Sequence, residues 1–175
     1  MMSPILAAAI GAALIAGGTP PQDPAATAAR PQSAKTSAAQ ALSAADRTFL
    51  IKAAEGGKAE VELAQLAQQR ASSDDVKALA KRIAEDHQQA NHDLEAIAGQ
   101  KNVSFPDSLN PEHAALKAKL EAASGVDFDR QYVGTMIEDH NRDIAEFQHI
   151  ASQSTDPDIK AFASKTLPTL QEHLR

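Results

Sequence analysis

The chain has 175 residues, of which 43% are hydrophobic and only 3% aromatic, with no Trp and no Cys. A core built from this composition is rich in Ala and Leu, which favours closely packed helices because Ala has the highest helix propensity. The net charge of −6 and the lack of a Lys/Arg cluster argue against nucleic-acid binding. The absence of Cys excludes disulfides, thiolate metal sites and a cysteine nucleophile.

The N-terminal segment predicts export. Residues 5–18 form an uninterrupted apolar and small-residue run, shorter than the roughly 20 residues that a membrane-spanning helix needs. We therefore interpret residues 1–18 as a signal peptide, although no Lys or Arg precedes the apolar run. Residues 19–42, rich in Pro, Ala, Gln and Ser, are expected to be a disordered linker to a domain over residues 43–175. After processing, no transmembrane segment is expected.

Helix start signals recur along this domain. A hydroxyl residue followed three positions later by an acid marks a helix start, because both side chains can accept orphan backbone N–H groups. This pattern occurs at Ser43/Asp46, Ser72/Asp75, Ser124/Asp127 and Thr155/Asp158. Asn110 before Pro111 adds a start, and Gly99 and Gly125 stand at expected helix ends. The sequence predicts no strand and helices at about 44–71, 74–99, 110–123, 126–152 and 157–174.

The lengths of the connections predict the topology. Short connections join the first long helix to the second and the third to the fourth, so each pair should form an antiparallel hairpin. Residues 100–125, which contain only one short helix, separate the two pairs. One long crossover is the ferritin-like arrangement of an all-α, antiparallel four-helix bundle. A plain up-down bundle with a decorated loop is the alternative.

Each of the four long helices places one ionisable residue on its apolar face. The tripeptide Glu-Asp-His occurs twice and ends at His87 and His140. Each of these histidines stands four residues after an apolar residue, as His87 does after Ile83. At 100° per residue, both histidines point inward, and so do Glu60 in the first helix and His173 in the last. These four side chains could share one layer of the core.

Such a cluster suits a metal ion. Burying a carboxylate is costly unless it is paired, and imidazoles with a carboxylate suit one divalent transition ion such as Zn, Fe, Cu or Mn. The predicted ligands are Glu60, His87, His140 and His173. Asp86 and Asp139 directly precede two of the histidines and could orient them or ligate. Two alternatives stay open: a structural Glu–His network without metal, and a pH switch titrating near ~6.5.

No catalytic motif supports an enzyme. A ferritin-like di-iron oxidase needs two Glu-x-x-His motifs, whereas the acids here fall one and two positions before His87 and His140, and one before His173. No Ser/His/Asp arrangement, phosphate loop or nucleotide motif is present. A non-catalytic role is therefore expected.

Several stretches resemble a known bacterial family. The segments "ASSDDVKALAKRIAEDHQQAN", "MIEDHNRDIAEFQ" and "DPDIKAFASKTLPTLQEHL" are similar to domain of unknown function 4142, often labelled as predicted outer membrane proteins. The resemblance covers roughly residues 45–174 and includes positions matching Glu60, His87, His140 and His173. It implies a ferritin-like bundle exported in Gram-negative bacteria, in the periplasm or at the outer membrane, with no established enzymatic activity.

The sequence thus predicts an exported bundle that acts in envelope metal handling or stress tolerance. The alternative is a module that binds an envelope protein or a second copy of itself, with a His/Glu cluster that only fixes the packing or senses pH.

Overall fold

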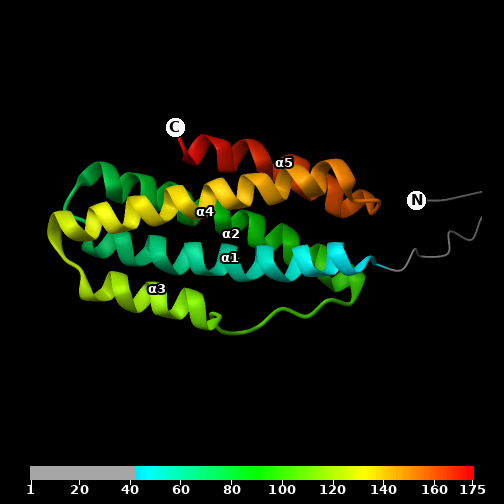
Figure 1. Ribbon diagram of the computed structural model, residues 1–175, viewed down its shortest axis with the longest axis horizontal. Helices are drawn as coiled ribbons and strands as arrows, with labels where there is room; N and C mark the ends of the chain where they lie inside the picture. The colour runs from blue at the N-terminus through cyan, green and yellow to red at the C-terminus, as the bar shows by residue number, and fades with distance from the viewer. Residues whose placement is uncertain (1–41) are drawn as a thin grey trace, which may run out of the picture. The chain divides into compact units, whose positions relative to one another are not determined.

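The computed structural model describes residues 42–175, so the predicted signal peptide and all but the last residue of the predicted linker lie outside the described residues. The described part forms five helices and no strand (Figure 1). They are α1 (Ala44–Arg70), α2 (Asp74–Lys101), α3 (Pro111–Ala122), α4 (Gly125–Gln153) and α5 (Pro157–His173). The all-α prediction is confirmed. None of these helices has an apolar stretch long enough to cross a membrane.

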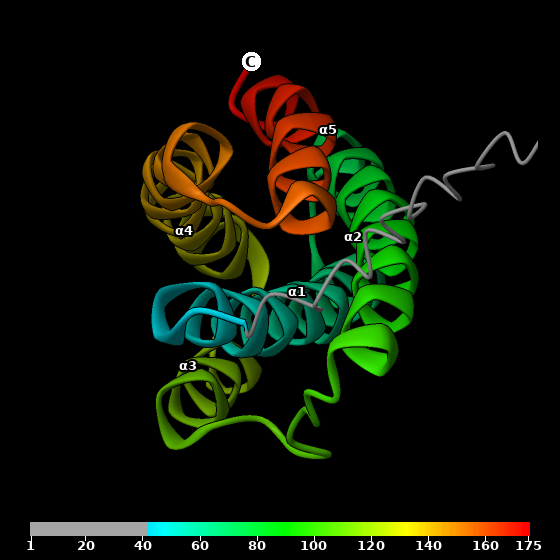
Figure 2. The same ribbon diagram turned by 90° about the vertical axis from the view of Figure 1, so that its right-hand side faces the viewer.

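Four of the helices surround a common core, and the fifth lies outside it. Helix α1 packs against α2, and α4 packs against α5. Contacts of α2 with α5 and of α1 with α4 close the ring, which is seen end-on in Figure 2. The connection after α2 runs along the bundle and leads into α3, which lies against the outer side of α1 (Figures 1 and 2). This segment covers one seam between α1 and α4, because α3 contacts both helices.

Two of the predicted helix starts form as the sequence indicates. The Ser43 side chain accepts the Asp46 N–H at 3.0 Å, and the Asn110 side chain accepts the His113 N–H at 2.9 Å. Pro111 occupies the first turn of α3, where its missing N–H has no intrahelical partner to lose. Local sequence is therefore sufficient to begin α1 and α3.

The predicted start at Ser72 is wrong in its mechanism. Helix α2 begins after Ser73, whose side chain makes no capping hydrogen bond. Asp129 of α4 instead accepts hydrogen bonds from the N–H groups of Ser72 and Ser73 and from the Ser72 hydroxyl. A tertiary contact therefore satisfies the donors that a local cap would have satisfied.

Other predicted caps also differ from the structure. Helix α5 is capped by Asp156, not Thr155, because the Asp156 side chain accepts the N–H groups that follow it. Gly99 lies inside α2, which ends two residues later at Lys101 and is followed by Asn102 in the left-handed conformation. Asn tolerates this conformation better than most residues. Gly125, also at positive φ, begins α4 rather than ending α3.

The core consists of two apolar clusters. The first brings together buried residues of α1, α2, α4, α5 and the connection after α2, namely Phe49, Leu50, Leu94, Ala98, Val103, Phe147, Ile150, Ile159, Phe162, Ala163 and Leu170. The second comprises Leu63, Ala64, Ala67, Ala71, Ala80, Ile83, Ala84, Leu120, Phe128, Tyr132 and Met136. Helix α5 contributes to the first cluster only, and Leu120 of α3 contributes to the second. Along α1, the boundary between the clusters falls at Glu60.

Candidate metal centre

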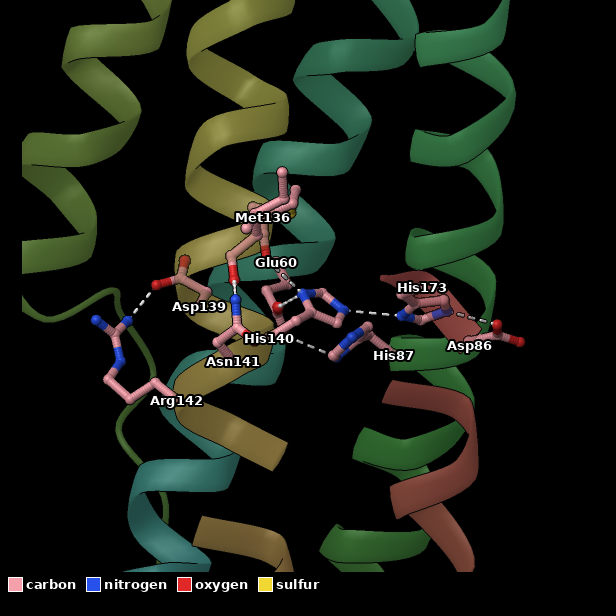
Figure 3. A network of polar contacts seen from close by, with 10 residues as sticks. Glu60, Asp86, His87, Met136, Asp139, His140, Asn141, Arg142 and His173 are labelled. Carbon is pink, nitrogen blue, oxygen red and sulfur yellow. Dashed lines mark hydrogen bonds and ion pairs between the residues drawn. The ribbon is translucent and has the colours of Figure 1, made fainter. Parts of the chain in front are cut away.

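The four inward ionisable residues lie together between the two apolar clusters, one on each bundle helix (Figure 3). Glu60 on α1 is 2% exposed and His140 on α4 is 1% exposed. His87 on α2 and His173 on α5 are 6% and 8% exposed. We call these four residues the polar layer. The structure therefore brings together the four residues that helical phase selected.

One nitrogen of each imidazole contacts an oxygen at the edge of the layer. His87 Nδ1 lies 2.9 Å from Glu60 Oε2. His140 Nδ1 lies 3.2 Å from Glu60 Oε1 and 3.0 Å from the Met136 carbonyl oxygen. His173 Nε2 lies 2.8 Å from Asp86 Oδ2. Figure 3 shows these contacts radiating from the three rings. Oxygen acceptors of this kind fix the tautomer and orientation of metal-binding histidines.

The other nitrogens of two rings face each other. His140 Nε2 and His173 Nδ1 are 2.8 Å apart. His87 Nε2 is buried and has no hydrogen-bond partner among the described residues. One ring nitrogen from each of the three histidines lies within 4.8 Å of the other two. The layer thus offers three imidazole nitrogens around a common point.

Proton counting shows what this arrangement lacks. A neutral imidazole carries one N–H. If His140 donates from Nδ1 to the Met136 carbonyl and His173 donates from Nε2 to Asp86, the two facing nitrogens both carry lone pairs. Lone pairs 2.8 Å apart repel unless a cation stands with them. That cation is either an added proton on one ring or a metal ion bound to both.

The charges in the layer are divided unevenly. Burial raises the pKa of Glu60, but attraction to His87 and to the other two histidines outweighs burial and holds that pKa below its ordinary value. Burial lowers the pKa of His87, but the Glu60 charge outweighs it and leaves that pKa raised. Burial keeps the pKa values of His140 and His173 low despite nearby carboxylates. The layer therefore favours an ionised Glu60–His87 pair beside two neutral imidazoles, the form in which imidazole binds metals.

The two predicted additional residues have different environments. Asp86 contacts the layer, but through His173 of α5 rather than through its sequence neighbour His87. Asp139 forms an ion pair with Arg142 and points away from the imidazoles (Figure 3). The partner of Asp86 lies on another helix, and the partner of Asp139 lies one turn further along α4. Adjacency to a histidine in the sequence therefore did not identify either partner.

A further acid near the layer was missed by the sequence analysis. Asp143 of α4 lines a cavity of about 330 Å³ together with Glu60 and His87. Burial, and then the charge of Glu60, raises the pKa of Asp143 to about 7. Its position three residues after His140 was the available signal, because that spacing places both on adjacent parts of one helix face.

One Glu-x-x-His spacing does occur in the sequence, at Glu146 and His149. His149 is exposed, as is His92, so neither contributes a ligand to the polar layer.

Comparisons with known proteins agree with this fold. The family model of domain of unknown function DUF4142 matches residues 31–175. A search of curated proteins gave no match. Among solved structures, a DUF305 fragment from Deinococcus radiodurans is similar, with a TM-score of 0.67 and 20% identity over 77% of this chain and 93% of that one.

Two further structures show the same fold at low identity. CopM in its Cu(II)-bound form aligns with a TM-score of 0.63 and 17% identity, covering 74% of this chain and 90% of that one. A DUF305 protein from Streptomyces coelicolor whose secretion is predicted has a TM-score of 0.63 and 16% identity, covering 75% and 88%.

Proposed function

Because the chain belongs to the DUF4142 family, whose function is unknown, we infer its role from the site and propose that it binds one transition-metal ion through His87, His140 and His173. In this proposal Glu60 and Asp86 are not ligands. They hold the outer nitrogens of the three rings and so aim the inner nitrogens at the ion.

The observation that carries the proposal is the facing pair of imidazole nitrogens. His140 Nε2 and His173 Nδ1 meet at 2.8 Å while their outer nitrogens are occupied by oxygen acceptors. His87 Nε2 is buried without a partner, and one ring nitrogen of each of the three histidines lies within 4.8 Å of the other two. A buried polar atom without a partner is costly. A metal ion bound to all three nitrogens would remove both the repulsion and the unsatisfied group.

Copper is the ion that we propose. Imidazole suits Zn, Cu, Fe and Ni, and Cu²⁺ stands at the top of the affinity order for divalent first-row ions. Support comes from CopM, which shares the fold and whose structures contain Cu(II), Cu(I) and Ag. At 16–18% identity this similarity supports only the class of ion, and the three histidines of this chain carry the rest.

We place this activity in the cell envelope and assign it to metal handling rather than catalysis. The N-terminal sequence predicts export, and a structurally similar DUF305 protein is predicted to be secreted. Burial of the polar layer favours storage or transfer of an ion over turnover of a substrate.

The spacing of the facing nitrogens also favours a second candidate. Two nitrogens bound to one tetrahedral ion at ~2.0–2.1 Å stand about 3.3 Å apart, and 2.8 Å is a hydrogen-bond length. A proton held between His140 and His173 would make the layer a structural or pH-sensing network, and the envelope partner would then bind elsewhere.

Metal analysis distinguishes the two candidates. The exported chain, expressed without a His tag, is exposed to Cu(II) or Zn(II), desalted and analysed by elemental mass spectrometry. We expect one equivalent of copper in the parent and none in a folded His87→Ala/His140→Ala variant. The matched control is His92→Ala/His149→Ala, which removes two exposed histidines and should leave the copper content unchanged.

Two outcomes would reject the metal proposal. A parent that retains neither ion would leave the proton-holding network as the function of the layer. Equal loss of copper in the control variant would indicate binding to exposed histidines instead.

A further inference from the structure

The polar layer is buried, so an ion can reach it only through an opening. A cavity of about 330 Å³ extends from the layer to the surface between α1, α4 and the start of α3. Glu60 and His87 line its inner end. Lys52 and Glu112 also line it and are exposed. A water molecule takes up roughly 30 Å³ of the liquid, so the cavity has room for an ion with part of its hydration shell.

Small residues on α1 create this space. Ala53 and Gly56 line the cavity, where larger side chains would fill it. A Cβ atom added at Gly56 would meet nothing within 4 Å. Gly in a helix interior is destabilising relative to Ala, because it loses more backbone entropy on folding. No neighbouring atom would clash with a side chain at position 56, so close packing does not explain Gly56. The open space beside this residue does explain it.

The charge of the cavity favours cations. Its ionisable lining includes four acids between the layer and the surface that lie on α1, α3 and α4, namely Glu55, Glu112, Asp143 and Glu146. Lys52 pairs with Glu146 at 3.9 Å, and Arg142 is held by Asp139. Among the described residues, Glu55, Glu112 and Asp143 have no cationic partner. A low-dielectric passage lined by uncompensated carboxylates raises the local concentration of cations.

Asp143 occupies the decisive position within this passage. It is half-buried and shares the cavity lining with Glu60 and His87. No hydrogen bond or ion pair to its carboxylate is present in residues 42–175. A partly buried carboxylate without a partner is unfavourable for folding, so its presence points to a ligand that arrives from solvent. The unpartnered, buried Nε2 of His87 marks the end of the same route.

We propose that this cavity is the path by which a transition-metal cation enters and leaves the polar layer, and that Asp143 is the carboxylate that receives the ion between the surface and the three histidines. This inference rests on the proposed metal-binding function. It adds a direction of access and a residue that governs the rate of exchange. A residue on a transit path changes the entry and exit rates together, whereas a ligand changes the equilibrium affinity.

Stopped-flow measurements of copper exchange test the path. The chain has one Tyr and no Trp, so quenching of Tyr132 fluorescence reports Cu(II) binding nearby. We expect Asp143→Asn and Gly56→Leu each to slow Cu(II) entry at least fivefold. Release into excess chelator should slow by a similar factor, and Kd should change less than threefold. Gly56→Ala and Glu138→Gln, which removes an exposed acid of α4, should retain parental rates.

Three results would overturn the inference. Parental rates in both test variants would reject the path while leaving the metal site intact. A Kd for Asp143→Asn weakened more than tenfold by faster release, with unchanged entry, would make Asp143 a ligand instead. A parent that binds no copper at all would reject the proposed function itself, and with it the path.

Discussion

At the scale of single residues, the site depends on side chains that hold the histidines as much as on the histidines. Asp86 reaches from α2 to His173 on α5 and accepts a hydrogen bond from its Nε2 at 2.8 Å. A charged acceptor at this nitrogen makes the opposite nitrogen a better metal ligand. The orientation of His173 is therefore set by a residue on another helix.

Asp86→Asn tests this support. The amide oxygen can still accept the hydrogen bond but carries no charge, so we expect copper affinity to fall by about 10- to 100-fold in a protein that remains folded. Competition with a chromophoric chelator measures the affinity. Glu85→Gln, an exposed neighbour paired with Lys81, is the control and should bind copper normally. Unchanged affinity in Asp86→Asn would show that His173 is not a ligand.

Asp143 should lower stability at neutral pH. Its pKa is raised to about 7 by burial, whereas an unfolded Asp titrates near ~3.9. Between these values the folded state binds the proton more tightly, so the folded state loses relative stability as pH rises through this window. We expect Asp143→Asn to stabilise the metal-free protein by about 1–3 kcal/mol at pH 8, with little gain at pH 4. Urea midpoints at both pH values measure this, and an equal gain at both would contradict it.

At the scale of helices, two adjacent glycines of α1 have opposite environments. A Cβ atom at Gly57 would lie 2.2 Å from the Asn91 side-chain oxygen of α2, whereas Gly56 faces open space. Close helix packing therefore requires glycine only at Gly57, at the contact between α1 and α2.

This difference predicts opposite effects of the same substitution. Gly56→Ala should stabilise the protein by about 0.5–1 kcal/mol, because Ala loses less backbone entropy in a helix. Gly57→Ala should destabilise it by roughly 1 kcal/mol, since Asn91 must move. Shortening the neighbour in Gly57→Ala/Asn91→Ala should recover most of that loss. Thermal unfolding measures all three variants, and equal effects of the two glycine substitutions would exclude this packing.

The helices also show what the sequence can and cannot predict. Helix start signals located the five helices, and apolar periodicity gave the inward phase of Glu60 and the three histidines, because both depend on local sequence alone. It could not find that Asp129 satisfies the start of α2, or that Asp86 contacts His173, because these contacts join residues distant in the chain. The same reason explains why the cavity beside Asp143 was not predicted.

At the scale of the whole molecule, the polar layer divides the apolar core in two. Each bundle helix contributes one ionisable residue to the layer, and apolar clusters lie on both sides of it. Burying such groups is unfavourable unless their interactions compensate. A bound ion stabilises the folded state by an amount that grows with the logarithm of its free concentration relative to Kd, about 2.7 kcal/mol at 100 Kd. Folding and metal binding should therefore be coupled throughout the domain.

The same coupling predicts how many protons copper displaces. At pH 6.5, three histidines with ordinary pKa values would together carry about 1.5 protons. Here the pKa of His87 is raised by Glu60, while burial lowers the pKa values of His140 and His173. Copper binding at pH 6.5 should therefore release close to one proton, mainly from His87, and affinity should increase as pH rises. Calorimetry in buffers of different ionisation enthalpy counts the protons. Release of 1.5 or more would mean that His140 and His173 also carry protons at this pH, which the lowering of their pKa values by burial should prevent.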